Sequence, residues 1–361
     1  MERLYSLQGL RGLAVLGVVL FHMMPIEARF SGGDTLLPPS LDFFQLGVDL
    51  FFVISGFVMV IVSRGRFQST VEAQRFLFNR LSRIYPTYWL YFFITLAVYL
   101  VQPGLVNSGH GSSNLLMSFL LLPNDKVLLV MVAWSLLFEL WFYLVFSGFL
   151  LFRERSLPVL LVVWAAVIVM FNALQDWQAY SSALKIILHP YSLEFIVGAA
   201  LALFFYGKHS ARVPTPVVWG LLAAALLVGI PLIAVNRLYD SQGLLRMVMV
   251  GTTFGLLVLT LALLERRRRI SIPAPLVAVG DMSYTIYLSH LLVLGVIGRV
   301  WSLVGNWPES YLDNLLFAVL MLSATVCYGW VGYRCFEKPV LDRANAFGKR
   351  RFRTDAAKAS A

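Results

Sequence analysis

The chain has 361 residues, of which 59% are hydrophobic and only 13% are charged. Soluble proteins carry about 25% charged residues, so this composition excludes an ordinary soluble protein, and the high apolar content excludes a disordered one. The formal net charge of +10 suits nucleic acid, anionic lipid or membrane topology equally well, so the positions of the charges must decide among them.

Apolar segments long enough to cross a bilayer as helices, about 20 residues each, recur along the whole chain. The expected spans are residues 8–26, 43–63, 84–102, 127–151, 157–173, 187–206, 215–235, 243–264, 276–298 and 313–335. A further apolar run, Leu115 to Leu122, is too short to cross and ends at Pro123, which indicates an interfacial or re-entrant piece. We therefore expect an all-α, polytopic membrane bundle of about ten helices.

The basic residues sort by side when ten spans are counted from a cytoplasmic N-terminus. Of the 29 Lys and Arg residues, 23 then lie on the cytoplasmic side and 6 on the other, Arg246 among the 6. This asymmetry is what the positive-inside rule predicts, so both termini are expected in the cytoplasm. The positive charge thus reports topology rather than binding of nucleic acid. Residues 1–342 form the predicted membrane domain, and residues 343–361 a basic cytoplasmic tail that we expect to be disordered.

The two cysteines, Cys327 and Cys335, lie eight positions apart in one span. That spacing is about 12 Å along a helix, too far for a disulfide. We interpret both as packing residues. No Cys/His cluster in the sequence indicates a metal site.

Ionisable residues inside spans are costly, and they usually face the bundle interior or an aqueous cavity. In the first span Arg11 precedes His22 by eleven residues, about three turns, so both side chains lie nearly on one helix face, roughly 16 Å apart along the axis. Asp49 in the second span has a depth similar to that of His22. An Asp beside a His can orient the ring and make it a better base.

On the cytoplasmic side, Arg80 and Arg83 share a helix face at the start of the third span. Paired guanidinium groups at a membrane surface suit bidentate binding of phosphate oxygens. Glu139 lies near the middle of the fourth span, below Trp134 and Ser135. The pattern favours phosphate binding on the inner side and acid–base chemistry in the outer half.

Each of these residues also has a purely structural interpretation. Arg80 and Arg83 would serve equally as topological anchors, and Glu139 as a tie between helices. His290, after Ser289 near a span end, is typical of an interfacial hydrogen-bonding residue. Asp281 is interpreted as a polar residue at the inner end of the ninth span. For Arg11 with His22 a functional role is favoured, because two costly residues at matched helical phase need a reason.

Five segments, in this order, resemble the acyltransferase family 3 membrane proteins. They are "YSLQGLRGLAVLGVVLFH", "FFQLGVDLFFVISGFVM", "RFLFNRLSRIYPTYWL", "WSLLFELWFYL" and "MSYTIYLSHLLV", and "FEKPVLDR" closes the series. The resemblance extends from about residue 3 to about residue 343. The start "RLYSLQGLRG" is most similar to the exopolysaccharide O-acetyltransferases.

The resemblance implies an O-acyltransferase of the bacterial inner membrane. It implies acetyl-CoA or another acyl-CoA as cytoplasmic donor, without a metal, and a carbohydrate hydroxyl as acceptor, on a surface or secreted polysaccharide or its lipid-linked precursor. Polysaccharide-assembly enzymes become candidate partners. Arg11 and His22 match the paired first-span residues needed for activity, Arg80 and Arg83 the arginine pair of the third span, and Glu139 the acidic residue of the fourth. The chain lacks the periplasmic esterase-like domain of some members, so we expect a stand-alone transferase.

The layout of these residues predicts a mechanism in outline. Arg80 and Arg83, with Arg11, would hold the phosphates of coenzyme A while its arm brings the thioester to His22. His22 then acts as general base, oriented by Asp49 or Glu139, or takes the acyl group itself. The competing hypothesis is a glycan or small-molecule transporter or flippase, since intramembrane Asp, Glu and His also mark proton relays and substrate paths. We find no inverted repeat in the sequence to favour it.

Overall fold

The computed structural model describes residues 3–31, 35–106, 112–174, 181–241, 243–304 and 311–359, and every regular element in those ranges is a helix. Ten helical stretches of the described residues are long and apolar enough to cross a membrane. They are Tyr5–Phe30, Pro39–Ser63, Thr70–Val101, Met131–Phe149, Glu154–Ala173, Ser182–Tyr206, Thr215–Val235, Leu244–Arg266, Ser283–Val304 and Tyr311–Phe352. The prediction of an all-α, multi-pass membrane protein is confirmed.

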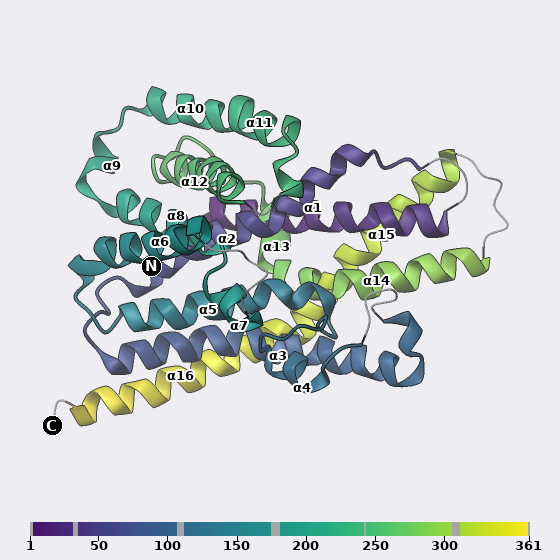
Figure 1. Ribbon diagram of the computed structural model, residues 1–361, viewed down its shortest axis with the longest axis horizontal. Coiled ribbons are helices and arrows are strands. Elements are labelled where there is room, and N and C mark those ends of the chain that lie inside the picture. The colour runs from purple at the N-terminus through teal and green to yellow at the C-terminus, as the bar shows by residue number, and fades with distance from the viewer. Residues whose placement is uncertain are drawn as a thin grey trace.

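The helices are labelled in chain order (Figure 1). Their bounds are α1 Tyr5–Phe30, α2 Gly47–Ser63, α3 Thr70–Val101, α4 Leu115–Leu120, α5 Trp134–Phe149, α6 Leu157–Leu174, α7 Ser182–Ile187, α8 Tyr191–Tyr206, α9 Lys208–Arg212, α10 Thr215–Ala224, α11 Ile230–Val235, α12 Leu244–Arg266, α13 Ala274–Asp281, α14 Ser283–Val304, α15 Tyr311–Gly332 and α16 Lys338–Ala359. Both ends of the chain lie toward the same end of the bundle (Figure 1), as an even number of crossings requires.

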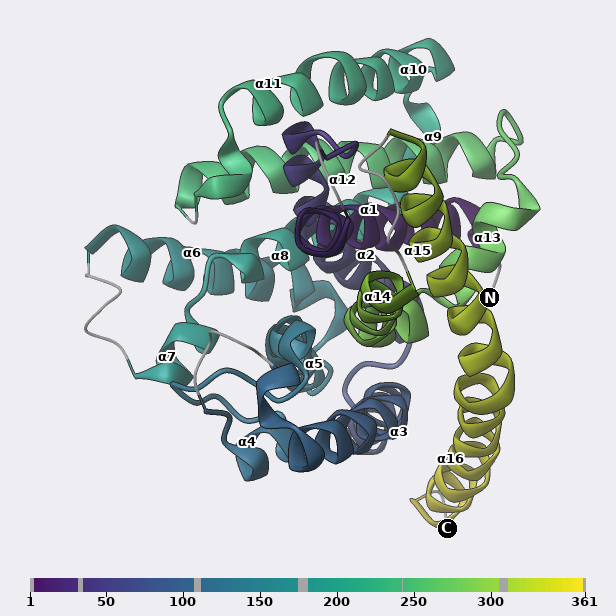
Figure 2. The ribbon, with the colours of Figure 1, turned by 90° about the vertical axis from the view of Figure 1, so that its right-hand side faces the viewer.

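A central group of helices is surrounded by a ring of peripheral ones (Figure 2). Helices α1, α2, α8 and α12 pack against one another at the centre. The α6 span and the segment Thr215–Val235 lie at the margin, and most of their side chains face outward. Those outward faces are apolar, with Val162 67% and Leu227 75% exposed. Such faces suit contact with lipid rather than water.

Glycines set the closest helix crossing, that of α2 with α8. Gly56 of α2 and Gly198 of α8 are buried. A Cβ added at Gly198 would lie 2.0 Å from the carbonyl oxygen of Val53, and one at Gly56 would lie 1.9 Å from that of Phe195. Small residues let membrane helices approach until their backbones touch. The crossing therefore fixes where α2 presents its remaining side chains.

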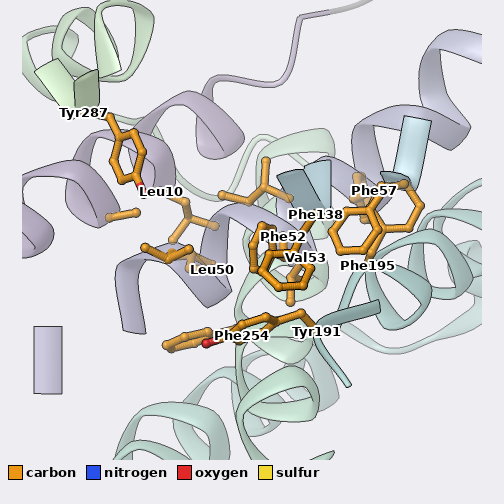
Figure 3. Packing of buried hydrophobic residues seen from close by; sticks show 14 of the residues in the cluster. Leu10, Leu50, Phe52, Val53, Phe57, Phe138, Tyr191, Phe195, Phe254 and Tyr287 are labelled. Atoms are coloured by element: carbon orange, nitrogen blue, oxygen red, sulfur yellow. The ribbon is translucent and has the colours of Figure 1, made fainter. Parts of the chain in front are cut away.

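Aromatic side chains fill the space between α2, α5 and α8 (Figure 3). The ring of Phe52 lies 5.4 Å from that of Phe142 and 5.1 Å from that of Tyr191, and Phe142 lies 4.7 Å from Phe195. Most of these pairs are edge-to-face or tilted, which is the favoured arrangement of aromatic quadrupoles. The cluster makes this part of the bundle a rigid support for neighbouring side chains.

The ninth span begins later than predicted, at Ser283 rather than residue 276. The short helix α13 ends at Asp281, and Met282 leaves the helical conformation, so α14 starts as a separate helix. Gly280 of α13 touches the backbone of Gln8 in α1, where an added Cβ would lie 1.9 Å from a carbonyl oxygen. This close contact holds α13 against α1 and breaks the continuous helix that hydropathy predicts.

The apolar run at Leu115 forms the short helix α4 and does not span the bundle, as predicted. Leu121, which follows the helix as its C-cap, adopts a left-handed backbone conformation. Carbonyl oxygens of α4 accept hydrogen bonds from aromatic side chains of α3, among them Trp89 Nε1 at 3.1 Å from the Phe119 oxygen and Tyr85 Oη at 2.9 Å from that of Leu120. Helix α3 thus satisfies backbone groups of this segment.

Part of the segment expected to form a disordered tail is helical. Helix α16 extends to Ala359, and Phe347 and Phe352 lie 5.9 Å from the ring of Phe78 in α3. The two cysteines also differ from expectation. Cys327 and Cys335 are both free and exposed, because they lie on the face of the last span that points away from the core.

Candidate active site

A cavity of about 290 Å³ lies among α1, α2, α3, α5 and α14. This volume is close to the lower end of the range for small-molecule sites, about 300–1,000 Å³. Apolar side chains of α2 form much of one wall. The polar residues that line the cavity are Arg3, Gln8, Arg11, Ser55, Arg80, Arg83, Ser135, Glu139, Tyr143, Ser283, Tyr284 and Tyr287.

The three arginines singled out from the sequence line this one cavity. Arg11 comes from the first half of α1, and Arg80 and Arg83 come from α3. Arg11 donates from Nη2 to Ser283 Oγ at 3.0 Å. The Arg80 guanidinium carbon lies 5.7 Å from the ring centre of Phe76, a cation–π contact.

Hydrogen-bonding capacity remains free in this arginine cluster. Arg80 Nε is buried and has no hydrogen-bond partner among the described residues. Neither Arg80 nor Arg83 forms a salt bridge with a carboxylate in the described part of the chain. Buried donors are normally satisfied, so the cluster suits an anionic ligand that supplies the missing acceptors.

Glu139 is the one carboxylate among the lining residues. Ser55 Oγ donates to Glu139 Oε1 at 3.3 Å, and the hydroxyl of Tyr143 donates to the same oxygen. This geometry does not support the sequence hypothesis that Glu139 orients His22, because the two hydrogen-bond partners of Glu139 are Ser55 of α2 and Tyr143 of α5. Glu139 instead offsets part of the positive charge of the cavity.

The cavity as a whole is positively charged, since four arginines and one glutamate line it. Arg3 is half-exposed and bound to Asp281, with Nη2 2.6 Å from Oδ2. This hydrogen bond to Asp281 raises the pKa of Arg3. Asp281, expected at the inner end of the ninth span, is instead the last residue of α13 and pairs with Arg3. The positive charge that remains free inside is therefore that of Arg11, Arg80 and Arg83, and it attracts anions.

His22 lies outside the cavity lining and pairs with His290 of α14. His290 Nε2 lies 3.3 Å from His22 Nδ1, and the ring centres are 4.8 Å apart. His290 is fully buried, whereas His22 is partly exposed. The interpretation of His290 as an interfacial hydrogen-bonding residue did not predict this burial. Its burial follows from the rotation of α14, which a sequence pattern does not reveal.

Tyr287 connects the cavity with the histidine pair. Its ring lines the cavity, and its hydroxyl lies 2.8 Å from Ser135 Oγ and donates to the carbonyl oxygen of Val132 at 2.8 Å. Its own carbonyl oxygen lies 2.7 Å from His290 Nδ1. One residue of α14 thus lines the cavity and also contacts a ring of the pair.

The sequence hypothesis required Asp49 to lie beside His22, but the structure does not bring the two residues together. Asp49 Oδ1 lies 2.7 Å from Arg246 Nη2, and Arg246 Nη1 lies 3.8 Å from Glu194 Oε1. All three side chains are buried. The sequence analysis counted Arg246 only as a charge on the non-cytoplasmic side and did not predict these buried partners. Two carboxylates inside spans are a signal that a buried cation partners them, and this signal would have identified Arg246.

The residues thus form two chemical zones: a basic cavity that suits a phosphate-bearing ligand, and a pair of imidazoles about three helical turns farther along α1. Imidazole is the usual general base of enzymes near neutral pH. No group of three or more His, Cys, Asp or Glu side chains in the described ranges is placed to hold a metal ion.

Residues 4–334 match the sequence model of acyltransferase family 3, described as an acyltransferase domain. The exopolysaccharide production protein ExoZ of Rhizobium meliloti is 32% identical over 313 residues, which cover 83% of this chain and 90% of ExoZ. The putative peptidoglycan O-acetyltransferase YrhL of Bacillus subtilis is 24% identical, and the match covers 96% of this chain but 56% of YrhL. No solved structure matches the chain.

Proposed function

The chain belongs to acyltransferase family 3 of membrane proteins, and from this premise we propose that it moves an acetyl group from acetyl-CoA to a polysaccharide hydroxyl. The acceptor is a surface or secreted polysaccharide or its lipid-linked precursor. The names of two relatives, an exopolysaccharide production protein and a putative peptidoglycan O-acetyltransferase, support a carbohydrate acceptor. We place the protein in the bacterial inner membrane with both termini in the cytoplasm, in keeping with its basic loops.

The observation that carries the proposal is the convergence of Arg11, Arg80 and Arg83 on one cavity. Coenzyme A bears its phosphates at the nucleotide end of a long flexible arm, and the thioester is at the other end. Guanidinium groups bind phosphate oxygens by charge-assisted, often bidentate, hydrogen bonds. The free Arg80 Nε is one donor that such an anion would satisfy. The small volume of the cavity suits part of the donor, namely its arm.

The thioester must then reach His22, which lies roughly 16 Å beyond Arg11 along α1. Tyr287 lines the cavity and contacts His290 through its carbonyl oxygen, and its hydroxyl lies 2.8 Å from Ser135 Oγ. The arm therefore runs along α1 and α14 and passes these two hydroxyls. Acceptor hydroxyls reach His22 from the opposite side of the bundle, where the ring is partly exposed.

His22 acts in this proposal as the general base. It takes the proton of the acceptor hydroxyl while the oxygen attacks the thioester carbonyl carbon. Collapse of the tetrahedral adduct forms the ester, breaks the carbon–sulfur bond and releases coenzyme A as a thiolate, which takes the proton back from His22. Glu139 tunes the charge of the donor cavity, and Asp49 is a positioning residue that fixes α2 through Arg246.

The decisive experiment uses two donor probes and the purified full chain. Acetyl-CoA carries the phosphates, whereas S-acetylpantetheine presents the same thioester without them. In the double variant Arg80→Gln/Arg83→Gln we expect acetyl-CoA to bind at least ~10-fold more weakly, since a hydrogen bond to a charged group contributes about 1.5–3 kcal/mol. The affinity for S-acetylpantetheine should stay the same.

The matched control is Arg153→Gln/Arg155→Gln, which removes the same charge from two exposed arginines and should leave both affinities unchanged. Equal weakening of both probes, or none, would contradict phosphate binding by the pair. Release of free coenzyme A in the presence of base-deacetylated exopolysaccharide, with mass spectrometry of the product, tests transfer itself. Uptake of labelled glycan without covalent modification would favour a transporter instead.

A further inference from the structure

His22 and His290 come from helices that are far apart in the sequence, α1 and α14, and their ring nitrogens meet at 3.3 Å. Each ring also touches a backbone carbonyl of its own helix through Nδ1. The distance is 2.9 Å from His22 Nδ1 to the Val18 oxygen and 2.7 Å from His290 Nδ1 to the Tyr287 oxygen. These contacts together determine where the protons of both rings lie.

A carbonyl oxygen only accepts hydrogen bonds, so a nitrogen that contacts one must carry the hydrogen. His290 Nδ1 therefore donates to the Tyr287 oxygen, and in the neutral ring His290 Nε2 has a lone pair. His22 Nδ1 likewise carries a hydrogen, shared between the Val18 oxygen and His290 Nε2. The remaining nitrogen, His22 Nε2, is then unprotonated, and no hydrogen-bond partner is recorded for it among the described residues.

Burial distinguishes the roles of the two rings. His290 is fully buried, with 0% of its surface exposed, whereas His22 is partly exposed. A buried ring with little access to water resists carrying a charge, so the imidazolium formed during the reaction stays on His22.

We propose that His290 is the positioning residue for His22, accepting the Nδ1–H of His22 at Nε2 and thereby leaving His22 Nε2 as the base. This inference rests on the proposed function of His22. When His22 Nε2 takes the acceptor proton, the ring becomes an imidazolium whose Nδ1–H still donates to His290 Nε2. That hydrogen bond strengthens as charge develops, so His290 stabilises the transition state while its own protonation is unchanged. The proton leaves His22 Nε2 with the coenzyme A thiolate.

Nitrogen-15 NMR of the full chain labelled on histidine tests the hydrogen bond without any assay of activity. The chain has five histidines, and the signals of His22 and His290 are assigned by their loss in the variants His22→Ala and His290→Leu. We expect the hydrogen on Nδ1 and the lone pair on Nε2 in both rings. A hydrogen on Nε2 of either neutral ring would overturn the proposal.

Kinetics of three variants test the consequence. His290→Leu removes the acceptor and should lower kcat by about 10–100-fold, as removal of an orienting partner does elsewhere, with the KM for acetyl-CoA unchanged. His290→Gln places an amide oxygen near the position of Nε2 and should recover most of the loss. His189→Leu is the control, because it removes a different imidazole, partly exposed like that of His22 and stacked on Tyr191, and it should keep kcat per folded molecule.

The outcomes separate the two proposals. Equal kcat in His290→Leu and the unchanged protein, or failure of His290→Gln to recover activity when both variants fold, would overturn the positioning role. Full activity of His22→Ala would overturn the proposed function of His22 and the kinetic part of this inference with it. The NMR signals would then still decide the hydrogen bond.

Discussion

Replacing glycine by alanine should destabilise the protein at Gly198, in the crossing of α2 and α8, and should not destabilise it at Gly220 of α10. At Gly198 the new Cβ would lie 2.0 Å from the carbonyl oxygen of Val53, well below the 3.4 Å of an ordinary contact. At Gly220 of α10 a new Cβ meets nothing within 4 Å. The first position is buried and the second exposed.

The size of each effect follows from these distances. In Gly198→Ala the two backbones must separate by more than 1 Å, because a carbonyl oxygen on a helix cannot move aside alone. Overpacking of this kind costs about 1–3 kcal/mol, and more where the backbone itself must shift. In Gly220→Ala the lower conformational entropy of alanine in the unfolded chain stabilises the helix by up to about 1 kcal/mol.

Thermal unfolding of the purified protein in one detergent measures both variants, with the monodisperse fraction after heating as a second readout. We expect Gly198→Ala to unfold at a clearly lower temperature than the unchanged protein, and Gly220→Ala at the same or a higher one. Gly56→Ala should behave like Gly198→Ala, since its Cβ would meet the Phe195 carbonyl oxygen from the other side. Equal stability of Gly198→Ala and Gly220→Ala would refute the inferred backbone contact.

Two further predictions concern buried charge. Arg246→Met should destabilise the protein by about 3–5 kcal/mol, because it leaves the buried Asp49 and Glu194 without their cation. The control is Arg237→Met, at an arginine whose side chain is 65% exposed, and it should change the unfolding temperature little. An equal change in both variants would contradict this prediction. Glu139→Gln removes the one negative charge that lines the cavity, so acetyl-CoA should bind more tightly by about 1 kcal/mol, whereas weaker binding in a titration would show that Glu139 supports the donor site directly.

Much of the architecture was predictable because it depends on local properties. The thickness of the bilayer sets the length of each apolar segment, so hydropathy was sufficient to find ten spans. The ninth span starts at Ser283 rather than at residue 276, where α13 packs on α1 through Gly280, a contact between distant segments. Arg80 and Arg83 were predicted to lie together because a spacing of three residues puts them on one helix face.

The partners of the intramembrane residues were not predictable in the same way. Asp49 was expected beside His22 because the two have similar depth, but depth does not give the rotation of a helix about its axis. The spans are apolar on nearly all faces, so no hydrophobic stripe indicates which face meets which neighbour. The buried partners of Arg246 and the contact of His290 with His22 were therefore not predicted.

The sequence by itself determined that this protein is a multi-pass helical membrane protein of an acyltransferase family, with costly polar residues inside its spans. Those features follow from composition, segment length and motif order, which are properties of the chain alone. Only the tertiary structure decided that Asp49 pairs with Arg246 and that His22 meets His290. Such pairs depend on which helices adjoin and how each is rotated, and close contacts such as Gly56 against Phe195 set both.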